Sequence, residues 1–202
     1  MNRAELKANA KAQIKGKIGI MLVITLIMAA LSAIASFLFG LIPVVGNILG
    51  PAIVAPAFAL SAVRVALNVA AGAKPSATDA FCGFDDFWSA IKLNLLVGLF
   101  TFLWSLLFVI PGIIKTISYS MSMYVLAENK GKPARECIKE SMAMTKGHKW
   151  ELFVLELSFI GWNLLCVVTF GIALIWVLPY MQVTYANAYN LLKSKKAAAI
   201  AE

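Results

Sequence analysis

The sequence predicts an all-α fold: a polytopic membrane protein with a bundle of six transmembrane helices in three hairpins and additional cytoplasmic amphipathic helices. Hydrophobic residues make up 61% of the 202 residues and charged residues only 14%, against about a quarter charged in an ordinary soluble domain. The apolar residues form long runs, and the basic residues behind the net charge of +8 collect at the ends of those runs. This clustering favours a lipid bilayer with anionic lipids, and not nucleic acid, as the partner of the positive charge.

Residues 1–17 are predicted to form a basic amphipathic N-terminal segment. Arg3, Lys7, Lys11 and Lys15 recur every fourth residue, which places them on one face of a helix. On an anionic leaflet each such cation gains about 1 kcal/mol, so we expect these four side chains to contact anionic lipids. The alternative is a purely topogenic role, in which the charges only keep the segment in the cytoplasm.

The first hairpin is predicted from two apolar runs and the turn between them. Residues 18–42 carry no charge and are long enough to span a bilayer. A turn at 43–47 leads to the second span at 51–72, whose many alanines suit close helix–helix contact. A cleaved signal peptide ending near Ala33-Ile34-Ala35 is the alternative for the first run, but the run continues past that site and exceeds a typical signal core.

Residues 73–90 are predicted to form a polar loop that leads into a short interfacial segment. Asp85 and Asp86 are the nearest approach to an acidic pair in this loop. Because a hard cation such as calcium takes six or more oxygen ligands, we expect the two aspartates to be ordinary solvated charges.

The second hairpin depends on Pro111-Gly112. The third span is predicted at residues 91–110, and a single helix over 91–127 would extend roughly 55 Å, far beyond a hydrocarbon core of about 30 Å. The chain must therefore turn, and a Pro-Gly pair favours a turn. The fourth span then covers residues 113–127, which are few and include several polar side chains.

Residues 128–149 are predicted to be a charged cytoplasmic segment with an amphipathic helix. Pro133 suits a first helical position, and Gly147 suits the end of the helix. Apolar and small residues mark one face at helical spacing, with charges opposite: Ala134, Cys137, Ile138, Ser141, Met142 and Thr145. We expect this helix to lie on the membrane or on the other helices.

The third hairpin consists of a fifth span at 152–168, a turn at 169–171 and a sixth span at 172–192 that is interrupted at Pro179. The membrane domain therefore covers residues 18–193, including the cytoplasmic loop 128–149. Residues 194–202 are predicted to form a cytoplasmic tail.

The distribution of charge predicts that both termini lie in the cytoplasm. With the N-terminus inside, all charged connections lie on one side, while the opposite side receives only turns without Lys, Arg, Asp or Glu: residues 43–50, 111–112 and 169–171. This asymmetry is the one that the positive-inside rule predicts for six spans with both ends inside.

The most distinctive stretches lie between about residues 100 and 192. They are Leu103-Trp104-Ser105-Leu106-Leu107, Ile110-Pro111-Gly112-Ile113-Ile114-Lys115, Ser118-Tyr119-Ser120-Met121, Ala127-Glu128-Asn129, Gly147-His148-Lys149-Trp150, Leu157-Ser158-Phe159-Ile160-Gly161-Trp162, Leu178-Pro179-Tyr180 and Ala186-Asn187. In these stretches the chain resembles a family of uncharacterised bacterial integral membrane proteins, the domain of unknown function nine-seven-five. The resemblance implies a multi-pass bacterial membrane protein and carries over no activity or catalytic residue.

No motif predicts an enzyme, a cofactor or a metal site. His148 is the only histidine, so an H-E-x-x-H site is excluded, and neither a G-x-S-x-G elbow nor a Walker loop is present. Cys82, Cys137 and Cys166 are widely spaced, and we predict that all three are free thiols.

Ionisable residues within the predicted spans are the first candidates for function. Arg64 and Glu156 lie about 12 and 9 Å from the inner ends of their spans at 1.5 Å per residue, and we predict an intramembrane ion pair between them. The alternative is that Arg64 extends to the headgroups while Glu156 faces the bundle.

Three polar stripes are the second candidates, as the lining of a polar cavity. They comprise Lys115, Ser118, Tyr119 and Ser122 on the fourth span, Asn94 and Thr101 on the third, and Gln182 and Tyr185 on the sixth. Interhelical hydrogen bonding, at about 0.6 kcal/mol for each bond, is the alternative.

Two functions remain open from the sequence. The first is an envelope structural or interaction protein that uses its cytoplasmic helices to bind a membrane or cytoplasmic protein. The alternative is a small transporter or lipid-handling protein that uses the polar stripes.

Overall fold

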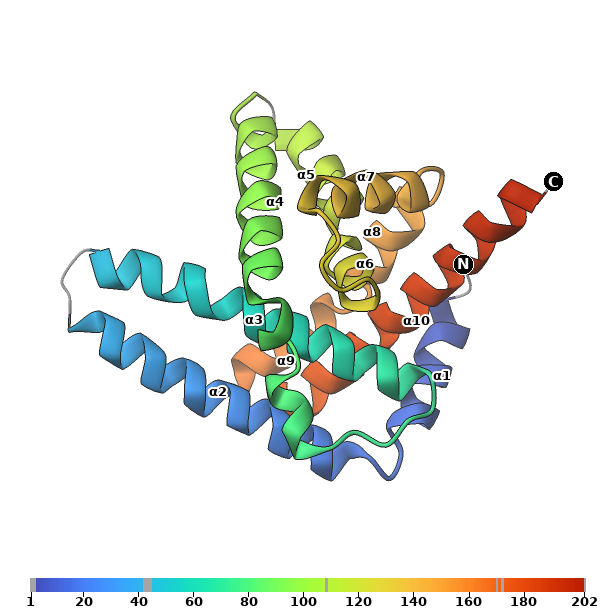
Figure 1. The fold of residues 1–202 in the computed structure, drawn as a ribbon. Coiled ribbons are helices and arrows are strands. Elements are labelled where there is room, and N and C mark those ends of the chain that lie inside the picture. Colours follow the sequence, from blue (N-terminus) through green and yellow to red (C-terminus); the bar gives the residue numbers. More distant parts are fainter. Residues whose placement is uncertain (1–2, 42–44, 108, 170, 172, 202) are drawn as a thin grey trace.

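The computed structural model describes residues 3–41, 45–107, 109–169, 171 and 173–201. Over these residues the chain is all-helical and contains no strand (Figure 1), which confirms that the fold is all-α. Four segments are long and apolar enough to cross a membrane: Ile18–Phe39, Ile53–Ala70, Ala77–Leu106 and Lys149–Val168.

The N-terminal helix α1 (Arg3–Ile14) packs against the C-terminal helix α10 (Leu174–Ala201). Leu6, Ala10 and Ile14 are four residues apart, so they share one face of α1, and all three are buried. The chain then turns at Gly16, whose φ of 81° favours glycine.

Helices α2 (Ile18–Gly40) and α3 (Val45–Ala70) lie side by side, and the C-terminal part of α2 and the N-terminal part of α3 extend away from the rest of the molecule (Figure 1). The connection before α2 satisfies carbonyls at the end of α3. Lys17 Nζ donates to the carbonyls of Gly72 at 3.0 Å and Ala73 at 2.8 Å. These bonds satisfy groups that a helix C-terminus leaves without partners.

Residues 77–86 form two short 3-10 helices, η1 (Ala77–Phe81) and η2 (Phe84–Asp86), that lead into α4 (Phe87–Leu107). Gly83, between them, lies directly against α3, where its N–H donates to Ser61 Oγ at 2.8 Å. A Cβ at Gly83 would collide with the Ala57 carbonyl. Glycine is therefore the residue that lets this connection pack on α3.

The predicted fourth span is divided into α5 (Val109–Tyr119) and α6 (Ser122–Glu128). Their 11 and 7 residues correspond to about 16 and 10 Å, so neither helix alone could cross a hydrocarbon core of about 30 Å. The continuous helix expected over residues 113–127 is therefore wrong.

The predicted turn at Pro111-Gly112 is also wrong, because both residues lie in the first turns of α5. Proline is tolerated there because the first N–H groups of a helix have no intrahelical partner. A Cβ at Gly112 would lie 2.6 Å from Ser105 Oγ. Gly112 thus provides the close approach of α5 to α4.

Helix α7 (Ala134–Thr145) has the predicted amphipathic face. Cys137, Ile138, Ser141 and Thr145 are buried, and the helix packs on α4, α5 and α6. Its apolar face therefore lies on other helices, one of the two placements expected from the sequence.

The predicted fifth span is interrupted. It forms α8 (Lys149–Leu157) and α9 (Ile160–Val168), separated at Ser158 and Phe159. Helix α10 then continues through Pro179 to Ala201, so most of the predicted tail is helical.

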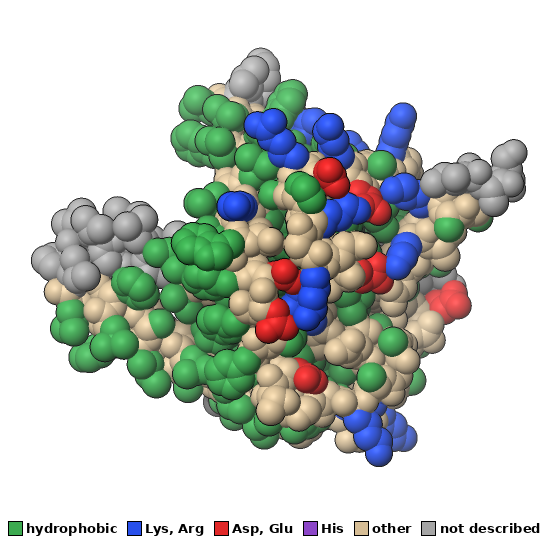
Figure 2. All heavy atoms as spheres, viewed as in Figure 1, with side chains coloured by type: hydrophobic (Ala, Val, Ile, Leu, Met, Phe, Trp, Pro, Cys, Tyr) green, Lys and Arg blue, Asp and Glu red, His purple; other side chains and the backbone are tan. Residues whose placement is uncertain are grey.

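The buried core lies where α1, α3, α6 and α10 meet, with Leu60, Val69, Leu126 and Tyr189 among its buried side chains. Large apolar residues remain exposed on the outer parts of the molecule: Leu26, Phe37, Leu38, Leu99, Phe102, Leu106, Leu164, Val167 and Val168. Figure 2 shows hydrophobic side chains over α2 and α4, while charged side chains gather over α7 and toward α10. Apolar surface on this scale is typical of contact with a membrane or with another protein.

Candidate functional site

The side chain of Arg64 is held inside the protein by three bonds. Its Nε donates to the Ala127 carbonyl at 3.4 Å, and its terminal nitrogens donate to the Cys82 carbonyl and to the Asp86 carboxylate. The Arg64 and Asp86 side chains are only 8% and 11% exposed. Arg64 therefore joins α3 to the connection before α4 and to the end of α6.

The predicted pair of Arg64 with Glu156 is corrected by this geometry, because the carboxylate on Arg64 belongs to Asp86. Arg64 also does not extend to the membrane surface, since its nitrogens are bonded within the fold. Glu156 is half-buried on α8. Depth along a span does not identify the partner of Arg64, because it does not determine which helix lies beside each residue.

Asp86 extends the connections of Arg64 to the loop after α6. Its second carboxylate oxygen accepts the Gly131 N–H at 3.1 Å. The neighbouring Asp85 contacts Lys130 at 3.0 Å and is 59% exposed, as expected for a solvated charge. Both aspartates were expected to be solvated, and for Asp86 this expectation is wrong. The sequence indicated a special role for Asp86 only through its place beside Asp85.

A second set of bonds joins the last residue of α6 to the C-terminal half of α10. Glu128 accepts hydrogen bonds from the Tyr189 hydroxyl at 2.9 Å and from Lys193 Nζ at 2.6 Å. Together with the bonds of Arg64 and Lys17, these contacts form what we call the polar base: Lys17, Arg64, Gly72, Ala73, Cys82, Asp86, Ala127, Glu128, Gly131, Tyr189 and Lys193.

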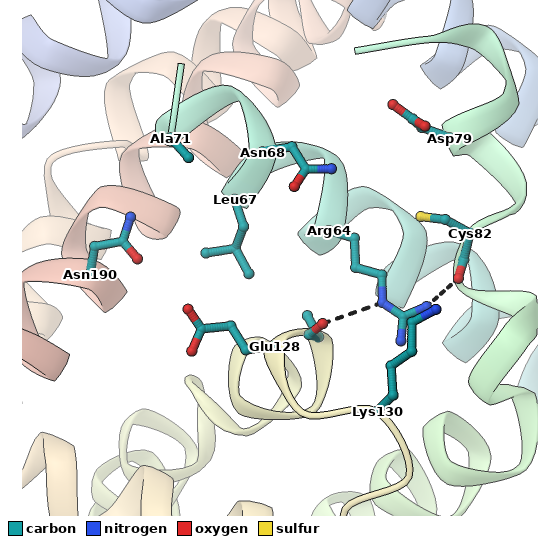
Figure 3. A pocket seen from close by; sticks show the side chains of 10 residues that line it. Arg64, Leu67, Asn68, Ala71, Asp79, Cys82, Glu128, Lys130 and Asn190 are labelled. Carbon is teal, nitrogen blue, oxygen red and sulfur yellow. Dashed lines mark hydrogen bonds between the residues drawn. The ribbon is translucent and has the colours of Figure 1, made fainter. Parts of the chain in front are cut away.

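A cavity of about 340 Å³ opens at the polar base (Figure 3). Asp79 and Glu128 contribute negative charge to its lining, and Arg64 and Lys130 contribute positive charge. In Figure 3 Arg64 points from α3 toward the Cys82 carbonyl and leaves Asn68 and Glu128 around the open space. Since the guanidinium already has three partners, it is a structural junction and not a free binding group.

The predicted polar stripes come together only in part. Asn94, Tyr119 and Ser122 line one cavity of about 230 Å³ between α4 and the α5–α6 break. The hydroxyl of Ser122 is buried and is the one such side-chain atom without a hydrogen bond in the described chain. Thr101 and Gln182 do not line this cavity.

The other members of the α5 stripe have separate contacts. Lys115 Nζ lies 4.6 Å from the centre of the Trp104 ring, a cation–π contact with α4. Ser118 Oγ donates to the Ile114 carbonyl, and Ser118 accepts a bond at its own carbonyl from Ser141 Oγ at 2.7 Å. The bond of Ser118 Oγ lies within α5, while the Lys115–Trp104 and Ser141–Ser118 contacts connect helices. Interhelical contact was the alternative interpretation of the stripes.

The four basic residues of α1 and its following turn do not share one environment. Lys7 Nζ donates to the Ser158 carbonyl at 3.1 Å and lies 4.3 Å from the centre of the Phe159 ring. Burial, with the nearby charge of Arg3, lowers the pKa of Lys7. Arg3, Lys11 and Lys15 are exposed, so Lys7 is directed into the fold while the other three remain available to the surroundings.

Lys11 lines a further cavity of about 260 Å³ between α1, α9 and α10. The rings of Trp162, Trp176 and Tyr180 form its aromatic walls, and Ile14 belongs to its apolar lining. Trp162 and Tyr180 are in edge-to-face contact at 6.1 Å. Tryptophan and tyrosine are the residues that accumulate at membrane–water interfaces.

A cluster of three charges lies at Glu140 of α7. Lys132 bonds to Glu140, and Lys196 of α10 lies 3.7 Å from the same carboxylate. The bond from Lys132 holds the pKa of Glu140 below its usual value, and in turn Glu140 raises the pKa of Lys132. Burial raises the pKa of Cys137 on the packed face of α7. All three cysteines are free, as predicted.

Comparison with known proteins gives a family and no activity. A family model described as "Protein of unknown function (DUF975)" matches residues 1–118 and 106–196. Neither the curated proteins nor the solved structures contain a match to the chain.

Proposed function

The chain belongs to the DUF975 family of proteins of unknown function, and on that premise we propose that it is a non-enzymatic, multi-pass protein of the bacterial cytoplasmic membrane that serves as a structural or interaction protein of the envelope. The polar base carries this proposal. An excursion here is a stretch of apolar helices that leaves one side of the protein and returns to it. The polar base joins the ends of these excursions on one side and leaves the apolar surfaces of α2, α4 and α9 to contact lipid.

The bonds of the polar base support three excursions that each leave and return to the same side. The bonds of Lys17 to Gly72 and Ala73 join the two ends of the α2–α3 excursion. The bond of Gly131 to Asp86 does the same for the excursion that begins with α4 and ends with α6. We therefore propose six crossings in three hairpins, with α5 and α6 crossing together.

The third excursion begins with α8 and returns with α10. Lys193 of α10 bonds to Glu128, and Lys196 lies near Glu140 of α7. Both termini then lie on the side of the polar base, and the positive-inside rule makes that side the cytoplasm.

The exposed face of α7 is the proposed docking surface for a protein partner. Arg135, Glu136, Lys139 and Lys146 are exposed while the opposite face is packed on the bundle. Figure 2 shows basic side chains gathered over this region. With three cations to one carboxylate, the surface favours an acidic partner in the membrane or the cytoplasm.

A transporter is less well supported, because the polar stripes do not meet in one cavity. The small transporter or lipid-handling alternative retains one observation in its favour, the aromatic cavity between α1, α9 and α10.

Site-specific photo-crosslinking in cells tests the docking surface. A photoreactive amino acid at Lys139 should yield a discrete adduct, and one at the exposed Lys195 of α10 should not. Charge reversal at Arg135 (Arg135→Glu) should reduce the adduct at position 139. Equal adducts at positions 139 and 195, unaffected by Arg135→Glu, would contradict the proposed surface.

A further inference from the structure

We propose that the cavity between α1, α9 and α10 binds one anionic phospholipid, with its phosphate on Lys11 and the start of an acyl chain along the apolar wall. The inference rests on contact of the chain with a bilayer, and not on the proposed six crossings or on the protein partner. It assigns to Lys11 a site of its own, distinct from a general attraction of α1 to the leaflet.

The lining of the cavity matches the chemistry of a phospholipid at the membrane interface. Among the described residues, Lys11 is the only charged one in the lining, and Trp162, Trp176 and Tyr180 form the walls beside it. Ile14 and Ile18 continue the lining in the direction of the α2 span. A cation, interfacial rings and an aliphatic strip thus follow one another, as the phosphate, glycerol and acyl parts of a phospholipid do.

The polar groups around this cavity are available to a ligand. Within the described residues Lys11 forms no ion pair, and the hydrogen-bonding groups of Trp162, Trp176 and Tyr180 have no protein partner. Lys7, on the same helix, is by contrast already bonded to the Ser158 carbonyl. The indole N–H and phenol O–H groups are donors that suit phosphate and ester oxygens.

The size and position of the cavity favour a lipid over a soluble anion. Its volume of about 260 Å³ is below the roughly 300–1,000 Å³ of sites that enclose a drug-sized ligand. It can therefore hold only part of a phospholipid, and the rest must remain in the bilayer. Trp162 and Trp176 are 44% and 60% exposed, so the cavity opens onto the apolar surface of α9 and α10 where acyl chains would lie.

The absence of a carboxylate in the lining favours an anionic over a zwitterionic headgroup. A zwitterionic headgroup would bring an ammonium group close to Lys11 with no acidic side chain in the lining to receive it. An anionic headgroup brings only charge of the sign that Lys11 attracts.

Quenching of tryptophan fluorescence by brominated lipids tests the inference. The full-length protein is placed in phosphatidylcholine nanodiscs that contain a small fraction of brominated phosphatidylglycerol, and in matched nanodiscs where the brominated lipid is phosphatidylcholine. We expect stronger quenching by phosphatidylglycerol, and we expect Trp162→Phe with Trp176→Phe to remove that excess. A Trp88→Phe variant should retain it.

The charge requirement is tested by Lys11→Ala against Lys15→Ala, since Lys15 is exposed nearby but does not line the cavity. Lys11→Ala should weaken the apparent affinity for phosphatidylglycerol about fivefold, the factor for one basic residue near an anionic surface, and Lys15→Ala by less than twofold. Unchanged melting temperatures confirm that both variants fold.

Three results would overturn the inference: equal quenching by the two lipids, equal loss in the two lysine variants, or competition by free glycerol phosphate as effective as competition by unbrominated phosphatidylglycerol. None of these results depends on which side of the membrane α1 occupies, so failure here leaves the proposed topology intact.

Discussion

Loss of Arg64 should destabilise the protein more than loss of any other single charge at the polar base. The variant Arg64→Met removes the charge while retaining an apolar stem of similar length. It leaves the Asp86 carboxylate, which is 11% exposed, without its partner. Breaking a buried ion pair in this way costs about 3–5 kcal/mol, which for a chain of this length corresponds to a fall in Tm of about 6–20 °C.

The partner of Arg64 is identified by two double-mutant cycles measured by SDS-induced unfolding in mild detergent, followed by circular dichroism. Arg64→Met with Asp86→Asn should show a coupling free energy of about 0.5–3 kcal/mol, because both changes act on one contact. Arg64→Met with Glu156→Gln should be additive to within about 0.5 kcal/mol. The variant Arg64→Lys should lose part of the stability, because an ammonium group cannot reproduce the fork of the guanidinium.

The reverse pattern would refute the assignment of the pair. Coupling of Arg64 to Glu156 together with additivity to Asp86 would restore the ion pair predicted from helical depth. Additivity in both cycles would mean that Arg64 acts only through the two carbonyl groups.

Two further predictions concern packing and pH. Gly83→Ala should lower the Tm by about 2–12 °C, since overpacking costs about 1–3 kcal/mol. Gly98→Ala should be tolerated, because no atom beyond its own helix backbone and chain neighbours lies within 4 Å of the added Cβ; equal melting of the two variants would contradict the close approach at Gly83. The pKa of Glu140 is lowered by Lys132, so the pair stabilises the fold above the ordinary glutamate pKa of 4.5 and this contribution is lost as the pH falls through the lowered value. The Tm difference between the wild type and Glu140→Gln should correspond to about 1 kcal/mol or less, as for a partly exposed pair. This difference should be constant from about pH 6 to pH 9 and shrink below pH 4.5. A Tm difference that grew in acid would contradict the stabilising role of the pair.

Local patterns in the sequence predicted the features of the fold that depend on a single helix. The buried face of α7 follows from the spacing of Cys137, Ile138 and Ser141, because residues three and four apart share a face in any helix. The apolar runs likewise predicted α2, α3 and α4, since a run of about 20 such residues has few alternatives to a membrane-spanning helix.

The candidate site could not be predicted in the same way, because it depends on how helices meet. Arg64 contacts Asp86 because the η1–η2 connection packs closely on α3. Counting residues along a span cannot predict this packing. Gly112 was recognised as a special position, but the sequence does not distinguish a glycine that turns the chain from one that admits Ser105 of α4. The interruption at Ser158-Phe159 likewise could not be predicted, because neither residue is a proline or a glycine.

In the proposed topology, three apolar excursions of the chain leave one cytoplasmic side and return to it. Single cysteines in a background without Cys82, Cys137 and Cys166 test it most directly, by labelling of intact cells with a membrane-impermeant thiol reagent before and after permeabilisation. Asn47→Cys should react in intact cells, and Lys139→Cys should react only after permeabilisation. Strong labelling of position 139 in intact cells would place α7 outside and would contradict the return of the chain through α5 and α6.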